Sequence, residues 1–155
     1  MDWTLFIIFL GACCAAAATG SMFSPGEWYR NLSKPVWTPP NWLFPIAWSV
    51  LYIALAFAAA RVAPLDGSSH AMAFWALQIA LNTLWTPIFF GLRRLGAGLV
   101  VILFLWASVI GLLATLWPLD RLAFWVLSPY LVWTTYAGAL NASIWWRNRT
   151  MPATA

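Results

Sequence analysis

The chain has 155 residues, of which 63% are hydrophobic and only 8% are charged. A water-soluble surface needs about 25–35% charged residues, so this composition indicates an integral membrane protein. The net charge of +4 is carried by scattered basic residues. Because nucleic-acid binding requires Lys and Arg to cluster against phosphates, we expect no nucleic-acid partner.

The charged residues divide the chain into five apolar stretches, each close to the roughly 20 residues that a helix needs to cross a bilayer. The predicted fold class is therefore all-α: an integral membrane bundle of five transmembrane helices in a single domain, residues 1–155. The predicted spans are residues 3–23, 45–63, 71–91, 95–117 and 122–146, and an aromatic loop covers residues 24–44.

The first apolar run resembles a signal peptide, because Ala16-Ala17-Ala18 is similar to a cleavage site. However, acidic Asp2 precedes the run where a signal peptide carries basic residues, and the run is longer than a typical hydrophobic region. We therefore predict an uncleaved first span.

The basic residues predict the orientation. One side carries six of them, in the first loop, the third loop and the C-terminus, namely Arg30, Lys34, Arg93, Arg94, Arg147 and Arg149. The other side carries two, Arg61 and Arg121. The positive-inside rule then predicts an N-terminus outside and a C-terminus in the cytoplasm. The sequence leaves open whether a bacterial inner or outer membrane holds the protein.

The segment from Trp28 to Tyr52 contains four Trp and four Pro. Proline lacks an amide donor and clashes with the preceding helical turn, so the segment is predicted to be partly extended before it enters the second span. Asn41, which follows two prolines, is the predicted N-cap of that span. The aromatic rings fit two interpretations: a cover over a flat apolar ligand, or a belt of anchors at the membrane surface.

The residues that several kinds of membrane-protein chemistry require are missing from the predicted spans. No Lys, Asp or Glu lies in a predicted span, which excludes a retinal Schiff base and the ionisable relay of an ion-coupled carrier. His70 is the only histidine and lies in a predicted loop, and the adjacent Cys13 and Cys14 match no metal or redox spacing. We expect no metal site, no obligatory cofactor and no catalytic residue.

Polar and aromatic residues recur at helical spacing in three spans, which aligns each set on one face. The sets are Phe44, Trp48 and Tyr52; Gln78, Asn82, Trp85 and Phe89; and Pro129, Trp133, Ala137, Asn141 and Trp145. Unpaired amides are costly in hydrocarbon, so the Gln and Asn side chains should face protein. Two roles stay open for them: joining helices, or also contacting a ligand.

Three motifs resemble the translocator protein family, also called tryptophan-rich sensory proteins or peripheral-type benzodiazepine receptors. The first joins Trp37-Thr38-Pro39-Pro40, Trp42, Phe44-Pro45, Trp48 and Leu51-Tyr52. The second is Asn82-x-x-Trp85-Thr86-Pro87-x-Phe89-Phe90-Gly91, and the third combines Pro129-Tyr130-x-x-Trp133 with Leu140-Asn141. The resemblance covers nearly the whole chain and is greatest to bacterial members.

The resemblance implies a five-helix bundle, commonly a homodimer, with a ligand pocket under the first loop. Family ligands are porphyrins such as protoporphyrin IX and other haem-type tetrapyrroles, cholesterol and benzodiazepine-type drugs. The implied function is a membrane receptor or sensor that regulates tetrapyrrole metabolism or a stress response. The alternatives are a transporter of tetrapyrrole, sterol or lipid, and light-dependent porphyrin breakdown.

The motif positions imply ligand-binding residues. Trp48 and Trp133 correspond to pocket tryptophans, Asn82 and Ala137 line or adjoin the pocket, and the remaining candidates are Phe44, Tyr52, Tyr29 and Leu140. Arg30 or Lys34 would meet porphyrin carboxylates. Ala142 replaces the tyrosine of the sterol-recognition pattern in animal members, so we expect no strong sterol specificity.

Overall fold

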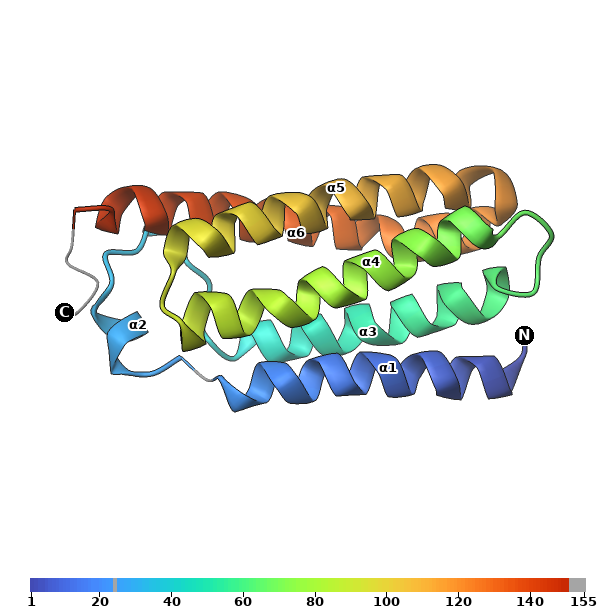
Figure 1. Ribbon diagram of the computed structural model, residues 1–155, viewed down its shortest axis with the longest axis horizontal. Helices are drawn as coiled ribbons and strands as arrows, with labels where there is room; N and C mark the ends of the chain where they lie inside the picture. The colour runs from blue at the N-terminus through green and yellow to red at the C-terminus, as the bar shows by residue number, and fades with distance from the viewer. Residues whose placement is uncertain (24, 151–155) are drawn as a thin grey trace.

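The computed structural model describes residues 1–23 and 25–150, which contain helices and no β-strand. Five long helices run side by side along the longest axis of the molecule (Figure 1). They are α1 Trp3–Met22, α3 Leu43–Val62, α4 Ser69–Thr86, α5 Leu95–Leu119 and α6 Arg121–Asn148. A short helix, α2 Glu27–Asn31, lies between α1 and α3, and a π-helix, η1 Pro87–Gly91, extends α4.

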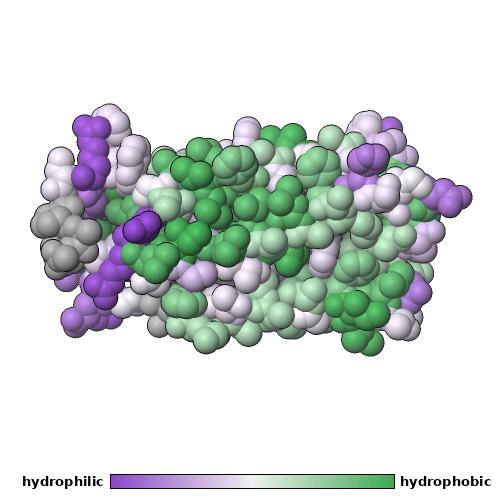
Figure 2. Space-filling view, viewed as in Figure 1, coloured by the Kyte–Doolittle hydropathy of each residue, from purple (hydrophilic) through white to green (hydrophobic). Residues whose placement is uncertain are grey.

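Four helices are long and apolar enough to cross a membrane: α1, α3, α4 together with η1, and α5. The longest helix, α6, is a further helix that carries more polar side chains, among them Thr134, Thr135, Asn141, Ser143 and Asn148. Figure 2 shows hydrophobic surface across the middle of the molecule and hydrophilic residues gathered toward its two ends. Four of the five predicted spans therefore have the length and composition of a membrane helix.

The start of α3 differs from the prediction. Trp42, and not Asn41, occupies the N-cap position, with helical backbone angles and no side-chain capping bond. The turn before it is closed by Leu43 N–H, which donates to the carbonyl of Pro40 at 3.0 Å. The prolines set this turn, so the chain enters the helix without the capping amide that the sequence predicted.

Helix α4 widens at Pro87. Proline has no N–H to continue the α-helical pattern, and the following turn is a π-helix in which Leu92 N–H donates to Pro87 O, five residues back, at 2.8 Å. Within this turn Phe89 is buried and stacks on Trp85, with ring centroids 4.8 Å apart. The π-helix thus fixes the direction of its two aromatic side chains, Phe89 and Phe90.

The helices do not pack uniformly. Helix α1 packs against both α3 and α4, α5 packs against α4 and α6, and α3 packs against α6. The backbones of α3 and α4 come close at few positions, and long side chains bridge them, as where Trp75 Nε1 donates to the carbonyl of Leu55 at 3.1 Å. The main core runs through α3, α5 and α6 and includes Leu55, Val62, Leu105, Val109, Leu112, Leu116 and Leu127. The separation of the α3 and α4 backbones leaves space for a cavity near the α2 end of the bundle.

Candidate functional site: an uncharged aromatic cavity

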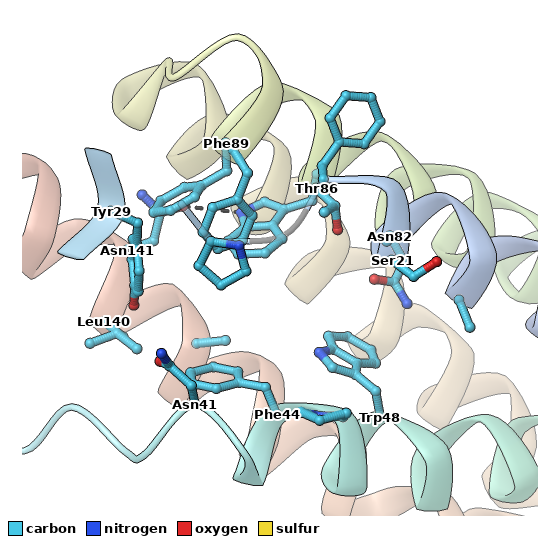
Figure 3. Close-up of a pocket in the computed structure, with 18 of the residues that line it drawn as sticks. Ser21, Tyr29, Asn41, Phe44, Trp48, Asn82, Thr86, Phe89, Leu140 and Asn141 are labelled. Carbon is cyan, nitrogen blue, oxygen red and sulfur yellow. Dashed lines mark hydrogen bonds between the residues drawn. The ribbon is translucent and has the colours of Figure 1, made fainter. Parts of the chain in front are cut away.

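A cavity of about 590 Å³ lies among α1, α3, α4, η1 and α6 and is covered by the segment that contains α2 (Figure 3). It falls within the range of about 300–1,000 Å³ that is usual for small-molecule sites. Every residue that lines it is uncharged: Ala17, Gly20, Ser21, Phe23, Pro25, Tyr29, Asn41, Phe44, Pro45, Trp48, Ser49, Tyr52, Asn82, Trp85, Thr86, Phe89, Phe90, Ala137, Leu140, Asn141 and Ile144.

Helix α3 supplies one aromatic wall. Phe44, Trp48 and Tyr52 are spaced four residues apart and all line the cavity, as their shared helical face predicts. The rings of Trp48 and Tyr52 lie 5.5 Å apart, tilted by 32°. Asn41 also lines the cavity just before the helix begins. This wall therefore offers a row of flat surfaces for stacking.

Helix α4 and η1 form the opposite wall, with Asn82, Trp85 and Phe89 (Figure 3). Asn82 Nδ2 donates to the Tyr52 hydroxyl at 3.1 Å, which joins the two walls at one end of the cavity. The buried amides of Gln78, Asn82 and Asn141 all face protein, and this prediction is confirmed.

Helix α6 supplies the floor through Ala137, Leu140, Asn141 and Ile144. Asn141 joins three helices, because its Oδ1 accepts from Trp85 Nε1 at 3.1 Å and its Nδ2 donates to the carbonyl of Leu95 at 3.0 Å. Both ends of this amide are thus used within the protein.

Trp133 is the one predicted site residue that does not line the cavity. Its ring packs against those of Phe44 and Trp48, at 5.7 and 6.4 Å between centroids, and so lies behind the α3 wall. Its indole N–H is buried without a partner among the described residues. Helical spacing placed Trp133 and Ala137 on one face of α6, but α3 covers that face at the level of Trp133.

The segment that covers the cavity is held by aromatic packing and by hydrogen bonds to α6. Tyr29 of α2 is buried, and its ring packs against those of Phe89 and Phe90 at 6.2 and 5.2 Å. Ser33 N–H donates to Asn148 Oδ1, and Asn148 Nδ2 donates back to Ser33 O, both at 2.9 Å. These contacts tie the loop to the end of α6.

The charged side chains of the covering segment contact other groups of the same segment. Lys34 Nζ donates to the carbonyls of Tyr29, Arg30 and Leu32 at 2.6, 2.9 and 3.1 Å, and burial lowers the pKa of Lys34. Arg30 lies 3.5 Å from Glu27. Lys34 is thus a cap of α2 and not the free cation that the sequence suggested for a ligand carboxylate. Burial, with a smaller contribution from Tyr136, raises the pKa of Tyr29.

Sequence reasoning missed the contribution of α1 to the cavity. Ala17, Gly20 and Ser21 line the cavity because their side chains leave its volume unfilled. Phe90 and Thr86 were also missed as wall residues, although both belong to the Asn82–Gly91 motif. No group of three or more His, Cys, Asp or Glu side chains is placed to hold a metal ion in residues 1–23 and 25–150.

Comparison with known proteins agrees with the motifs. The model of the TspO/MBR family matches residues 5–147. Protein CrtK of Rhodobacter capsulatus is 52% identical over 149 residues, covering 94% of this chain and 93% of that protein. The tryptophan-rich sensory protein of Cereibacter sphaeroides is 50% identical over 144 residues, covering 91% and 89%. The human translocator protein is 34% identical over 134 residues, covering 81% and 79%.

The family match extends over nearly all of the helical bundle, and the apolar helices make the protein an integral membrane protein. The relatives include sensory proteins of bacteria and translocator proteins of mammals. On this evidence the chain belongs to the TspO/MBR family.

Proposed function

We propose that the protein is a membrane receptor or sensor that binds a porphyrin, such as protoporphyrin IX or another haem-type tetrapyrrole, in the cavity. The observation that carries this proposal is the lining itself, which is rich in aromatic rings and contains no charged residue. Stacked aromatic pairs contribute about 0.5–1.5 kcal/mol each beyond burial, so a flat macrocycle suits such walls. The regulated process would be tetrapyrrole metabolism or a stress response.

Each candidate residue has a role in this proposal. Phe44, Trp48 and Tyr52 would stack against the ligand from α3, with Asn82 opposite them. Ala137 and Leu140 would support it from below, and Tyr29 would close the site from above. Trp133 would act indirectly, by holding the Phe44 and Trp48 rings in place. Sterols and benzodiazepine-type molecules would be further lipophilic ligands of the same cavity.

We also propose that α6 is the fifth span of a single five-helix domain. Its 28 residues correspond to about 42 Å, which exceeds the roughly 30 Å of the hydrocarbon layer. Its buried polar residues Thr134, Asn141 and Asn148 face protein, which removes their cost in lipid. The charge distribution supports an outside N-terminus and a cytoplasmic C-terminus.

A homodimer is part of the proposal. Gly11 and Ala15 of α1 are exposed and lie four residues apart, a spacing at which small residues allow two helices to approach closely in a membrane. A Cβ added to Gly11 would meet no atom within 4 Å, so this part of α1 has room for a neighbouring helix.

A fluorescence titration tests ligand binding. Protoporphyrin IX is added in the dark to the protein in phosphatidylcholine nanodiscs, and quenching of tryptophan emission is followed. We expect saturable binding that weakens about tenfold in Trp48→Leu, a loss of about 1.4 kcal/mol. Trp125→Leu is the matched control, because Trp125 is 63% exposed and lies against Trp117 and Phe124, away from the cavity.

The two variants separate binding from partitioning of the dye into the bilayer. Non-saturable quenching of equal size in the wild type and Trp48→Leu would reject the cavity as a porphyrin site. Trp133→Leu should weaken binding less than Trp48→Leu, because Trp133 does not line the cavity.

A further inference from the structure

Two rows of small residues border the cavity between α1 and α3. One row belongs to α1 and the segment that follows it: Ala17, Ser21 and Pro25. The other belongs to the first turns of α3 and the residues just before them: Asn41, Pro45 and Ser49. Both rows repeat every four positions. All six residues line the cavity, and all six are exposed. None is aromatic or charged.

Each row lies at the boundary between the inner and outer faces of its helix. On α3, Trp48 lines the cavity, Ser49 follows it, and Val50 is 62% exposed on the outer face. On α1, buried Ala16 precedes Ala17, and Met22, next to Ser21, is 77% exposed. Because these six residues line the cavity and are also exposed, the two rows mark where the cavity opens at the surface between α1 and α3, an opening that we call the slit.

The edges of this slit are not bonded to each other. The Ser21 hydroxyl donates to the carbonyl of Ala18 at 2.7 Å, and the Ser49 hydroxyl donates to the carbonyl of Pro45 at 2.8 Å. Each hydroxyl is thus satisfied within its own helix, and no side-chain hydrogen bond joins α1 to α3 across the part of the chain that the structure describes. These two bonded hydroxyls therefore cost little in contact with hydrocarbon.

The end of the cavity under the cover is closed by several hydrogen bonds. The Ser33–Asn148 pair, the Lys34 ammonium on three carbonyls, and the Tyr136 hydroxyl donating to Trp37 O at 2.7 Å all hold the cover. Opening it would break several hydrogen bonds and expose Tyr29. Widening the slit would break none of these bonds.

We propose that the ligand enters and leaves the cavity sideways, from the bilayer, through the slit between α1 and α3. This inference rests on the proposed binding function, and it narrows the ligand class to flat molecules that are apolar enough over most of their surface to partition into lipid. Such a molecule passes edge-on between rows of small side chains, while the cover stays closed.

A cleavable cross-link tests the route. In a Cys13→Ala/Cys14→Ser background, Ala17→Cys/Ser49→Cys is loaded with protoporphyrin IX in phosphatidylcholine nanodiscs in the dark. The slit is then bridged with a bis-maleimide that contains a disulfide spacer, and release into excess empty phosphatidylcholine vesicles is followed by recovery of tryptophan fluorescence. The matched control is Ser33→Cys/Asn148→Cys, bridged in the same way across the cover.

We expect the bridged slit to slow release about tenfold or more, and reduction of the spacer to restore the original rate, since access affects rates more than equilibrium. The bridged cover should release ligand at the unbridged rate. Release that is unchanged by the slit bridge, or slowed only by the cover bridge, would overturn the route. If the unbridged protein binds no porphyrin saturably, the proposed function fails instead.

Discussion

At the scale of single residues, the buried amides divide into two groups. Asn141 uses its oxygen and its nitrogen to join α4, α5 and α6, and Gln78 Oε1 accepts from the Tyr130 hydroxyl at 2.8 Å. Asn82 donates to Tyr52 but accepts from no described residue, and it lines the cavity. Of the two roles that the sequence left open, joining helices suits all three, and only Asn82 keeps a carbonyl oxygen for a ligand.

Enlarging Ala137 should weaken ligand binding. Ala137→Leu adds a branched side chain to the cavity floor, where unfilled volume accepts it, so we expect folding to be retained and porphyrin affinity to fall about tenfold through crowding. Ala139→Leu is the control, because Ala139 is exposed on the same helix. Titration and thermal unfolding are measured together; equal affinity in Ala137→Leu and the wild type would contradict the position assigned to Ala137.

The ion pair at the far end of the bundle should make stability depend on pH. Arg61 approaches Asp120 Oδ2 at 2.8 Å, and Ala123 N–H donates to Asp120 Oδ1 at 3.0 Å. Burial alone would raise the pKa of Asp120, but these hydrogen bonds and the Arg61 charge outweigh it, so the pKa lies below the ordinary 3.8. A carboxyl group whose pKa is lower in the folded state stabilises the fold at pH values above its unfolded-state pKa. This stabilisation is lost as the pH falls through its folded-state pKa.

Thermal unfolding of Asp120→Asn in detergent checks this sign. The variant should unfold at a lower temperature than the wild type at pH 7, and the difference should shrink below pH of about 4. Asp66→Asn is the control, since Asp66 is exposed in the loop between α3 and α4. A difference that is constant from pH 7 to pH 3 would show that the carboxylate charge is not the cause.

At the scale of elements, sequence predicted the long helices well because charged and turn residues mark their ends. The predicted 95–117 and the observed Leu95–Leu119 share a start, and the predicted 122–146 lies inside Arg121–Asn148. The sequence did not predict α2 or the π-helix at Pro87. The five residues of α2 are held by Lys34 and by packing of Tyr29. Short elements of this kind depend on contacts made only in the folded molecule.

Restoring regular helix at η1 should damage the cavity. Pro87→Ala returns an N–H and raises helix propensity, so the π-turn should relax toward an α-helix. Phe89 and Phe90 would then point in new directions, and their contacts with Trp85 and Tyr29 would be lost. We expect porphyrin affinity to fall and thermal stability to change little, because the regained helical hydrogen bond offsets the lost aromatic contacts.

Pro129→Ala is the matched control for this change, because Pro129 lies inside α6 and does not line the cavity. Affinity is measured by titration, and helix content by circular dichroism. Wild-type affinity in Pro87→Ala would mean that the π-helix is not needed to orient the aromatic wall.

At the scale of the whole molecule, the site could be predicted in part because family motifs fall on helices that meet. Seven of the eight candidate residues line one cavity, although they come from α2, α3, α4 and α6. The misplacement of Trp133 and the missed wall of α1 share a cause. Spacing along a helix defines a face, but which neighbour covers that face is decided by how α3 packs between its partners.

The cover should be the part of the molecule most sensitive to Asn148. This side chain is 4% exposed and joins Ser33 to the end of α6 across 115 positions of the chain. Asn148→Ala leaves the Ser33 N–H and C=O without their partner. Because Ser33 is exposed, water replaces part of this bonding, and we expect a cost of about 0.5–1.5 kcal/mol. We therefore expect faster amide hydrogen exchange in residues 25–42 and unchanged exchange in α5, with Arg147→Ala as the control.

Because the ligand route passes between α1 and α3, porphyrin release should keep its wild-type rate in Asn148→Ala, and faster release would indicate exit through the cover.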